Sequence, residues 1–309
     1  ENGDSIMMRL NTLDFDESLV FAGKGAEKNN FLIDMYLVNE DEEKLVNEYF
    51  HLEAPTYLQK MDSLRQMKLE QYENLVNNFN LSEDAKGISL AVINYHHYGN
   101  MEIYPYMHKK LKQLSKIEKL PSDFYSYRPA VNYSDKMLSH FRPYMNFMVV
   151  HINNLSYNDC LLKCEKEVVT VEESLHYHTH KLELIDSLVA ENAIKDILFR
   201  NTAYTFFFDN HDPELNEKFI ERFNKYAENH SYADEINQLY TSISQLQSGK
   251  LMPQVQLVNV NGEEVQIKNT CKKNKTLYYF WSLNQRGHIK NITSRIAQLK
   301  EKYPNYHFV

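Results

Sequence analysis

Apolar residues recur every three or four positions along most of the chain, which is the spacing of an amphipathic helix. One such stripe consists of Leu58, Met61, Leu64, Leu69, Tyr72, Leu75, Val76 and Phe79. Similar patterns predict further helices at roughly 142–154, 170–189, 191–208, 214–228 and 232–247. Because no fixed repeat period is present, we expect antiparallel helical hairpins over residues 25–248 rather than a solenoid.

Several residues mark where individual helices should begin and end. Ser82 precedes two acidic residues, a combination typical of an N-cap and a first helical turn. Asp212 precedes Pro213, and proline is favoured at the first position of a helix. Gly99 is placed to end the helix that follows Ser82.

The pattern changes at Gly249, where short β-compatible runs replace the helical period. Asn261-Gly262 lies between two such runs and is a strong hairpin signal. Residues 276–281 are apolar with little alternation, as in a strand buried on both faces. A helical stripe, Ile289, Ile292, Ile296 and Leu299, follows and precedes a last apolar run at 306–309. This order predicts a β-α-β unit with an extra hairpin.

The fold class expected from these patterns is α+β, with a mostly helical domain at 25–248 followed by an α/β domain at 249–309. Residues 1–24 contain β-compatible apolar runs, which we interpret as the end of an upstream β-rich segment.

Composition narrows the range of functions. The net charge of −8 argues against general nucleic-acid binding, which requires clustered Lys and Arg. No apolar run approaches the length of a membrane span. Three cysteines are too few for a disulfide scaffold. Since the chain has no phosphate-binding loop, nucleophile elbow or His-Glu-x-x-His motif, we expect no cofactor.

The C-terminal residues resemble the start of a TlpA/ResA-type thioredoxin domain. The similar positions are Met252-Pro253-Gln254-Val255-Gln256-Leu257, Asn261-Gly262, Val265 and Phe280-Trp281-Ser282. The segment from Phe15 to Leu32 is similar to the junction in bacterial cell-envelope members that carry a helical domain ahead of the thioredoxin fold. The resemblance implies a thioredoxin-like domain at 249–309, with further strands, a cis-proline loop and a last helix expected beyond Val309. It also implies a location in the bacterial periplasm or at the outer membrane, where members can carry a lipid anchor.

The chain departs from this family at the redox motif. Active members carry Trp-x-x-x-Cys-x-x-Cys with the first Cys at the start of a helix, which lowers the pKa of that thiol. Here Gln285 and His288 occupy the two cysteine positions, with Arg286 between them. Neither a carboxamide nor an imidazole can carry out thiol–disulfide exchange. We therefore expect no catalytic residues here, and a binding surface made by Trp281, Gln285, Arg286 and His288.

Other polar clusters allow weaker interpretations. His176, His178 and His180 would share one face only in an extended segment, so they are weak metal candidates in the helix predicted here. Cys160 and Cys164 are spaced as helix neighbours, which fits two buried thiols and also allows a bridge or a shared metal.

Two further clusters have simple structural explanations. Asp209, His211 and Asp212 could form a carboxylate–histidine dyad, but a helix stop followed by a capped helix start explains them more simply. His96 and His97 lie beside tyrosines at an expected core edge.

Two functions remain open from the sequence. The favoured one is a redox-inactive thioredoxin-like protein that binds a protein or peptide partner, or serves as an assembly subunit, in the cell envelope. The alternative is a thiol–disulfide oxidoreductase that uses cysteines outside the usual motif, such as Cys160 and Cys164, or cysteines beyond Val309.

Overall fold

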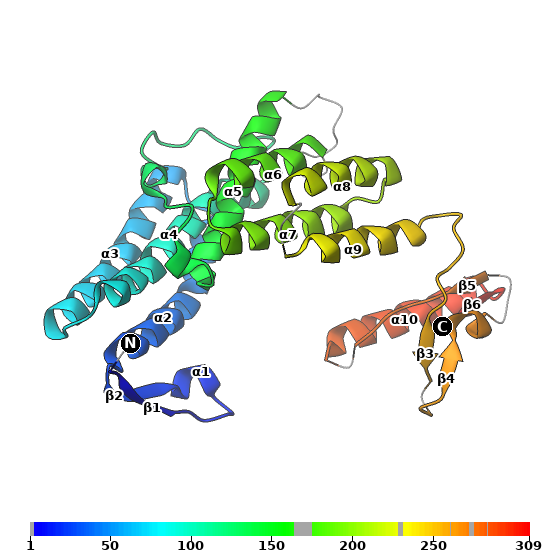
Figure 1. Ribbon diagram of the computed structural model, residues 1–309, viewed down its shortest axis with the longest axis horizontal. Coiled ribbons are helices and arrows are strands. Elements are labelled where there is room, and N and C mark those ends of the chain that lie inside the picture. Colours follow the sequence, from blue (N-terminus) through cyan, green and yellow to red (C-terminus); the bar gives the residue numbers. More distant parts are fainter. Residues whose placement is uncertain (1–2, 164–174, 228–230, 260, 272–274, 283) are drawn as a thin grey trace. The chain divides into compact units, whose positions relative to one another are not determined.

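The protein is mostly helical, with short strand pairs near both ends of the chain (Figure 1). The computed structural model describes residues 3–163, 175–227, 231–259, 261–271, 275–282 and 284–309. The chain divides into two compact units, Glu1–Tyr240 and Thr241–Val309. We describe each of them by itself.

The first unit begins with a hairpin that is attached to a long helix. Strands β1 (Ser5–Arg9) and β2 (Val20–Lys24) are antiparallel and are joined through the short helix α1 (Phe15–Ser18). The side chain of Asn30, on the following helix, donates to the carbonyl of Phe21 at 2.9 Å and accepts from its amide at 2.8 Å. The β-compatible pattern of residues 1–24 therefore corresponds to a hairpin that belongs to the helical unit.

Eight helices make up the rest of the described part of this unit. They are α2 (Glu27–Tyr49), α3 (Ala54–Asn78), α4 (Glu83–Leu111), α5 (Arg142–Lys163), α6 (Leu175–Leu188), α7 (Asn192–Asp209), α8 (Pro213–Ala227) and α9 (Ala233–Gln245), which extends past Tyr240. Irregular chain with 3₁₀ turns at Arg128–Ala130 and Lys136–Leu138 connects α4 to α5. The helices predicted from periodicity are confirmed wherever the chain is described.

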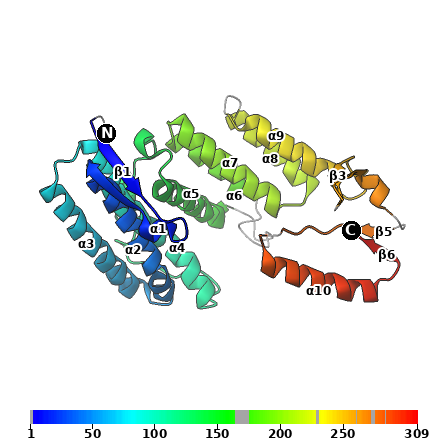
Figure 2. The same cartoon turned by 90° about the horizontal axis from the view of Figure 1, so that it is seen from below.

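Helices α2, α3 and α4 lie side by side and share two apolar clusters (Figure 2). One cluster has Met35 and Ile93 at its centre. In the other, the rings of Tyr57 and Tyr104 stack with their centroids 4.0 Å apart. Farther along the chain, Phe206 stacks on Phe219 at 4.1 Å, which joins α7 to α8. Tyrosines and phenylalanines thus make up much of the core, together with aliphatic residues and methionines.

The predicted helix starts are confirmed, but the predicted stop at Gly99 is wrong. The hydroxyl of Ser82 accepts from the amide of Ala85 at 3.1 Å, and Asp212 accepts from the amide of Glu214 at 2.8 Å. Helix α4 continues through Gly99 to Leu111. A glycine inside a helix costs about 1 kcal/mol, and burial of residues such as Met101 and Tyr104 beyond it outweighs that cost.

The second unit contains two separate strand pairs and one long helix. Strands β3 (Gln256–Val258) and β4 (Glu264–Gln266) form the predicted hairpin, and Gly262 has a positive φ of 84° in its turn. Strand β5 (Lys275–Leu277) pairs in parallel with β6 (Tyr306–Phe308), and α10 (Arg286–Lys302) connects them. The β-α-β order is therefore present.

The strand predicted at 276–281 is shorter and less buried than expected. Strand β5 ends at Leu277, and two further backbone hydrogen bonds connect this segment to Val309, which donates to Leu277 and accepts from Tyr279, each at 3.0 Å. Phe280 and Trp281 are 82% and 54% exposed. Within the described part of this unit no third strand joins the β5–β6 pair, so nothing covers the end of the apolar run.

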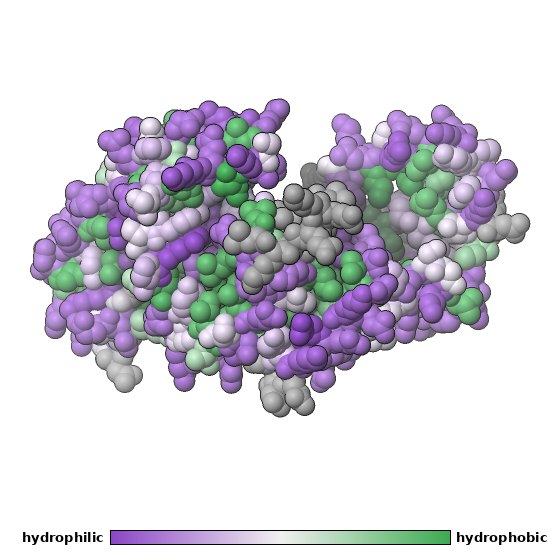
Figure 3. All heavy atoms as spheres, turned by 90° about the horizontal axis from the view of Figure 1, so that it is seen from above, coloured by the Kyte–Doolittle hydropathy of each residue, from purple (hydrophilic) through white to green (hydrophobic). Residues whose placement is uncertain are grey.

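No helix in the described part of the chain is both long enough and apolar enough to cross a membrane. Hydrophilic side chains cover much of the face seen in Figure 3, with apolar side chains scattered among them.

Candidate functional site

The candidate binding residues lie around the start of α10. We call residues 280–282 and 284–288 the entry segment of this helix. Gln285 is the N-cap residue, yet its side chain makes no capping hydrogen bond. Its amide donates to the carbonyl of Ser282 at 3.0 Å, a backbone hydrogen bond that leads the chain into the helix.

The entry segment presents its side chains to solvent. Trp281, Gln285 and His288 are all exposed, as is Phe280. Arg286 is the first residue of the helix, and its side chain lies outside the described part of the structure. The first amides of a helix have no intrahelical acceptor and carry a partial positive charge. The segment therefore combines exposed aromatic surface with backbone donors that suit a polar or anionic group.

None of the described thiols lies at this helix start. Cys271 is free and exposed, and its sulfur lies 3.1 Å from the hydroxyl of Tyr278. Cys160 is fully buried in α5 and is disulfide-bonded, so the interpretation as a free buried thiol is wrong and the bridge that the spacing also allowed applies. Cys164 lies outside the described residues.

The three alternating histidines lie on α6, as the helical interpretation requires, and do not converge. His178 is buried and its ring meets that of Phe206 edge-on. His176 and His180 share the other face and both approach Asp159 of α5, with N···O distances of 3.1 and 3.6 Å. The sequence analysis did not pair these two histidines with a carboxylate.

The remaining predicted clusters have structural roles. Asp212 caps α8, as expected from the simpler interpretation. His97 is 7% exposed, and burial lowers its pKa to about 3, so the ring is neutral at physiological pH. Burial likewise lowers the pKa of His96 to about 4.

A fully buried carboxylate, which the sequence analysis missed, lies at the centre of the helical unit. Glu102 of α4 has no exposed surface. Arg128 donates Nε to Oε1 at 2.9 Å and Nη2 to Oε2 at 2.6 Å, and the hydroxyl of Tyr127 donates to Oε1 at 2.8 Å. On α5, His151 donates Nδ1 to Oε1 at 2.7 Å and Asn154 donates to Oε2 at 2.5 Å.

The hydrogen bonds from Arg128 and His151 stabilise the buried negative charge of Glu102. Burial by itself would raise the pKa of Glu102, but hydrogen bonds from His151 and Arg128 outweigh it and hold the pKa below its ordinary value. The hydroxyl of Tyr133 lies 2.8 Å from Nε2 of His151, which extends the chain of contacts by one residue. Because Glu102 lies on α4 and its partners come from α5 and the irregular connection, the network fixes that connection to both helices.

A buried lysine is the second feature that the sequence analysis missed. Lys181 of α6 is 3% exposed, and its ammonium lies 4.3 Å from the centre of the Tyr177 ring. Burial lowers the pKa of Lys181 to about 7, although the charge of Asp209 acts in the opposite direction. The amine therefore changes charge near neutral pH.

Neither the network around Glu102 nor Lys181 carries a recognisable sequence motif. The partners of Glu102 are 25 to 52 positions away from it, and only the tertiary fold brings them together.

Comparison of the chain with protein-family models, with curated proteins and with solved structures found no match.

Proposed function

We propose that the protein is a redox-inactive, thioredoxin-like binding protein of the bacterial cell envelope that docks an extended polypeptide at the entry segment of α10. The observation that carries this proposal is the start of α10 itself. It follows a strand that is parallel to β6 and is preceded by two exposed aromatic residues, and the resemblance described above aligns Gln285 with the nucleophilic thiol of active thioredoxins.

The chemistry of this segment suits a polypeptide. Aromatic side chains supply large contact areas at low entropic cost and are enriched among residues that dominate binding energy. The amides at the helix start can receive a carboxylate or a backbone carbonyl. Arg286, the first residue of the helix, adds a positive charge to the sequence of this segment. An extended peptide with an apolar residue near an acidic group would match both the exposed aromatic side chains and the amides at the helix start.

Trp281 allows this binding to be measured directly, because it is the only tryptophan in the chain. Titration with short extended peptides should shift its emission to shorter wavelength as water leaves the half-exposed indole. We expect Phe280→Ala, which keeps the reporter, to weaken binding about 5- to 10-fold, since truncating an aromatic anchor commonly costs more than 1 kcal/mol.

The matched control is Leu251→Ala, which removes an apolar side chain that is 94% exposed in the same unit but lies outside the entry segment. Its affinity should equal that of the parent protein. Equal losses in both variants, or no spectral change with any peptide, would argue against docking at this segment.

The alternative function, thiol–disulfide exchange outside the usual motif, finds less support. An attacking thiol must be an exposed thiolate. Cys160 is fully buried, and Cys271 is a single exposed thiol without a second described cysteine beside it. A disulfide-reductase assay with Cys271→Ser as the comparison separates the two functions: the proposal predicts no turnover from either protein.

A further inference from the structure

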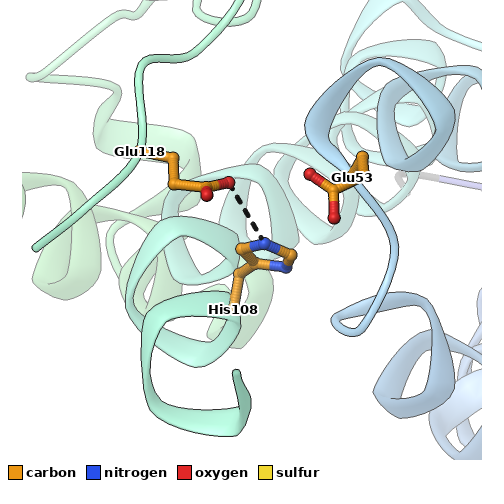
Figure 4. A group of neighbouring side chains, drawn as sticks. All are labelled: Glu53, His108 and Glu118. Atoms are coloured by element: carbon orange, nitrogen blue, oxygen red, sulfur yellow. Dashed lines mark ion pairs between the residues drawn. The ribbon is translucent and has the colours of Figure 1, made fainter. Parts of the chain in front are cut away.

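Three side chains with metal-binding groups converge where α2, α3 and α4 meet the irregular connection (Figure 4). Glu53 precedes α3, His108 lies in the last turn of α4, and Glu118 lies in the connection. One ligand atom from each lies within 4.8 Å of the others. Figure 4 shows both carboxylates on the same side of the imidazole as Nε2.

The orientation of His108 is fixed by its surroundings. The residue is 3% exposed, and its ring stacks on Tyr104 with centroids 5.1 Å apart. Nδ1 lies 2.9 Å from the carbonyl oxygen of Phe50. A carbonyl only accepts, so Nδ1 carries the proton and donates it. A hydrogen bond of this kind is the usual support of a metal-binding histidine, because it leaves the lone pair of Nε2 pointing at the metal.

The opposite nitrogen faces acceptors rather than donors. Nε2 of His108 lies 3.5 Å from a carboxylate oxygen of Glu118. A neutral imidazole with its proton on Nδ1 presents a lone pair there, and a carboxylate also presents lone pairs. One ligand atom from each of the three side chains therefore lies within 4.8 Å of the others, close enough for one cation to contact all three.

The surrounding charge also favours a cation. Helices α2 and α4 both end here, and the C-terminus of a helix carries partial negative charge. Glu53 is the N-cap residue of α3, but its side chain makes no capping hydrogen bond and stays available. One nearby positive group is Lys112, whose ammonium lies 3.6 Å from Glu53 and partly neutralises it.

We propose that Glu53, His108 and Glu118 bind a divalent transition-metal ion. One imidazole nitrogen and two carboxylate oxygens form a ligand set that suits Zn²⁺ and related first-row ions. The two glutamates are half exposed or more, so water can complete the coordination. The ion would join the α2–α3 turn, the end of α4 and the connection, and would thereby stabilise the folded unit.

The test is Co²⁺ and Zn²⁺ binding by the full chain, carried out in a Cys271→Ser background so that the exposed thiol cannot act as a ligand. Co²⁺ should bind with one equivalent, giving visible d–d absorption, and Zn²⁺ should displace it. Because the ion binds the folded state, the melting temperature should rise with its concentration. Glu53→Gln and Glu118→Gln should each weaken binding at least ~10-fold, since even outer partners of metal ligands contribute that much.

Two further variants make the test specific. Lys112→Met removes the competing ammonium and should strengthen binding, an effect opposite in sign to that of the glutamate variants. His176→Gln disrupts the separate Asp159–His176–His180 group and should leave binding unchanged. Absence of Co²⁺ and Zn²⁺ binding would overturn the proposal. So would affinity that persists in both glutamate variants, or that disappears with His176→Gln.

Discussion

Glu102→Ala is expected to lower the free energy of unfolding by roughly 3–5 kcal/mol, the range measured when one partner of a buried ion pair is removed. The substitution leaves Arg128, His151 and Asn154 without the acceptor that now receives their hydrogen bonds. It also leaves a cavity in place of a side chain that has no exposed surface. Urea unfolding monitored by far-UV circular dichroism measures the loss.

Tyr133→Phe is the matched control for this substitution. It removes the outermost contact of the same network, the 2.8 Å approach to His151, and leaves all partners of Glu102 in place. Its cost should be about 1 kcal/mol, as for an ordinary hydrogen bond. If Glu102→Ala costs no more than this control, the network does not hold the connection between α4 and α5.

The same carboxylate should contribute to acid unfolding. The pKa of Glu102 in the folded protein lies below its ordinary value, so the unfolded state takes up a proton first as the pH falls. The stabilisation is fully present above the unfolded-state pKa and is lost as the pH falls through the folded-state pKa. Glu102→Ala should therefore be less sensitive to acid than the parent protein.

Lys181→Met should change the pH dependence of stability at neutral and alkaline pH, whereas Glu102 acts at acid pH. The folded protein releases the proton of Lys181 near pH 7, whereas the unfolded chain holds it up to the ordinary value of 10.5. Between these values the unfolded state binds more protons, so the stability contribution of Lys181 rises with pH by about 1.4 kcal/mol per pH unit. Below pH 7 Lys181 is buried in its charged form, and this burial destabilises the folded state most.

Methionine keeps the length of the side chain without the charge, so the variant should be more stable than the parent protein below pH 7. This advantage should shrink steadily as the pH rises toward 10. Urea unfolding of both proteins from pH 6 to 10 gives the difference directly. Lys218→Met, which removes an exposed lysine paired with Glu214, serves as the control and should show no such trend between pH 7 and 9. Parallel curves for Lys181→Met and the parent protein would contradict the burial argument.

The helical part of the fold was predictable because its signals are local. A three-to-four spacing of apolar residues and caps such as Ser82 and Asp212 require no knowledge of distant parts of the chain. The prediction that α4 ends at Gly99 was wrong because packing with distant parts of the chain decides where this helix ends. The propensity of one residue ends a helix only where packing does not reward its continuation, and here Met101 and Tyr104 are buried in the next turns.

The side-chain groups were much less predictable. Glu102 meets residues 25, 26, 49 and 52 positions away, and His108 meets a carbonyl 58 positions away. Nothing in the local pattern marks these partners. The α6 histidines show the intermediate case, since the helix correctly separates His178 from its neighbours, but the approach of His176 to Asp159 depends on how α5 packs against α6.

The central claim, that the entry segment of α10 binds a partner, is tested most directly by site-specific photo-crosslinking in the source cells. A photoreactive residue in place of the exposed Gln285 is compared with one in place of the exposed Gln66 of α3. The account predicts a defined envelope polypeptide crosslinked from position 285 and absent from position 66. No crosslinked partner at 285, or the same products from both positions, would contradict it.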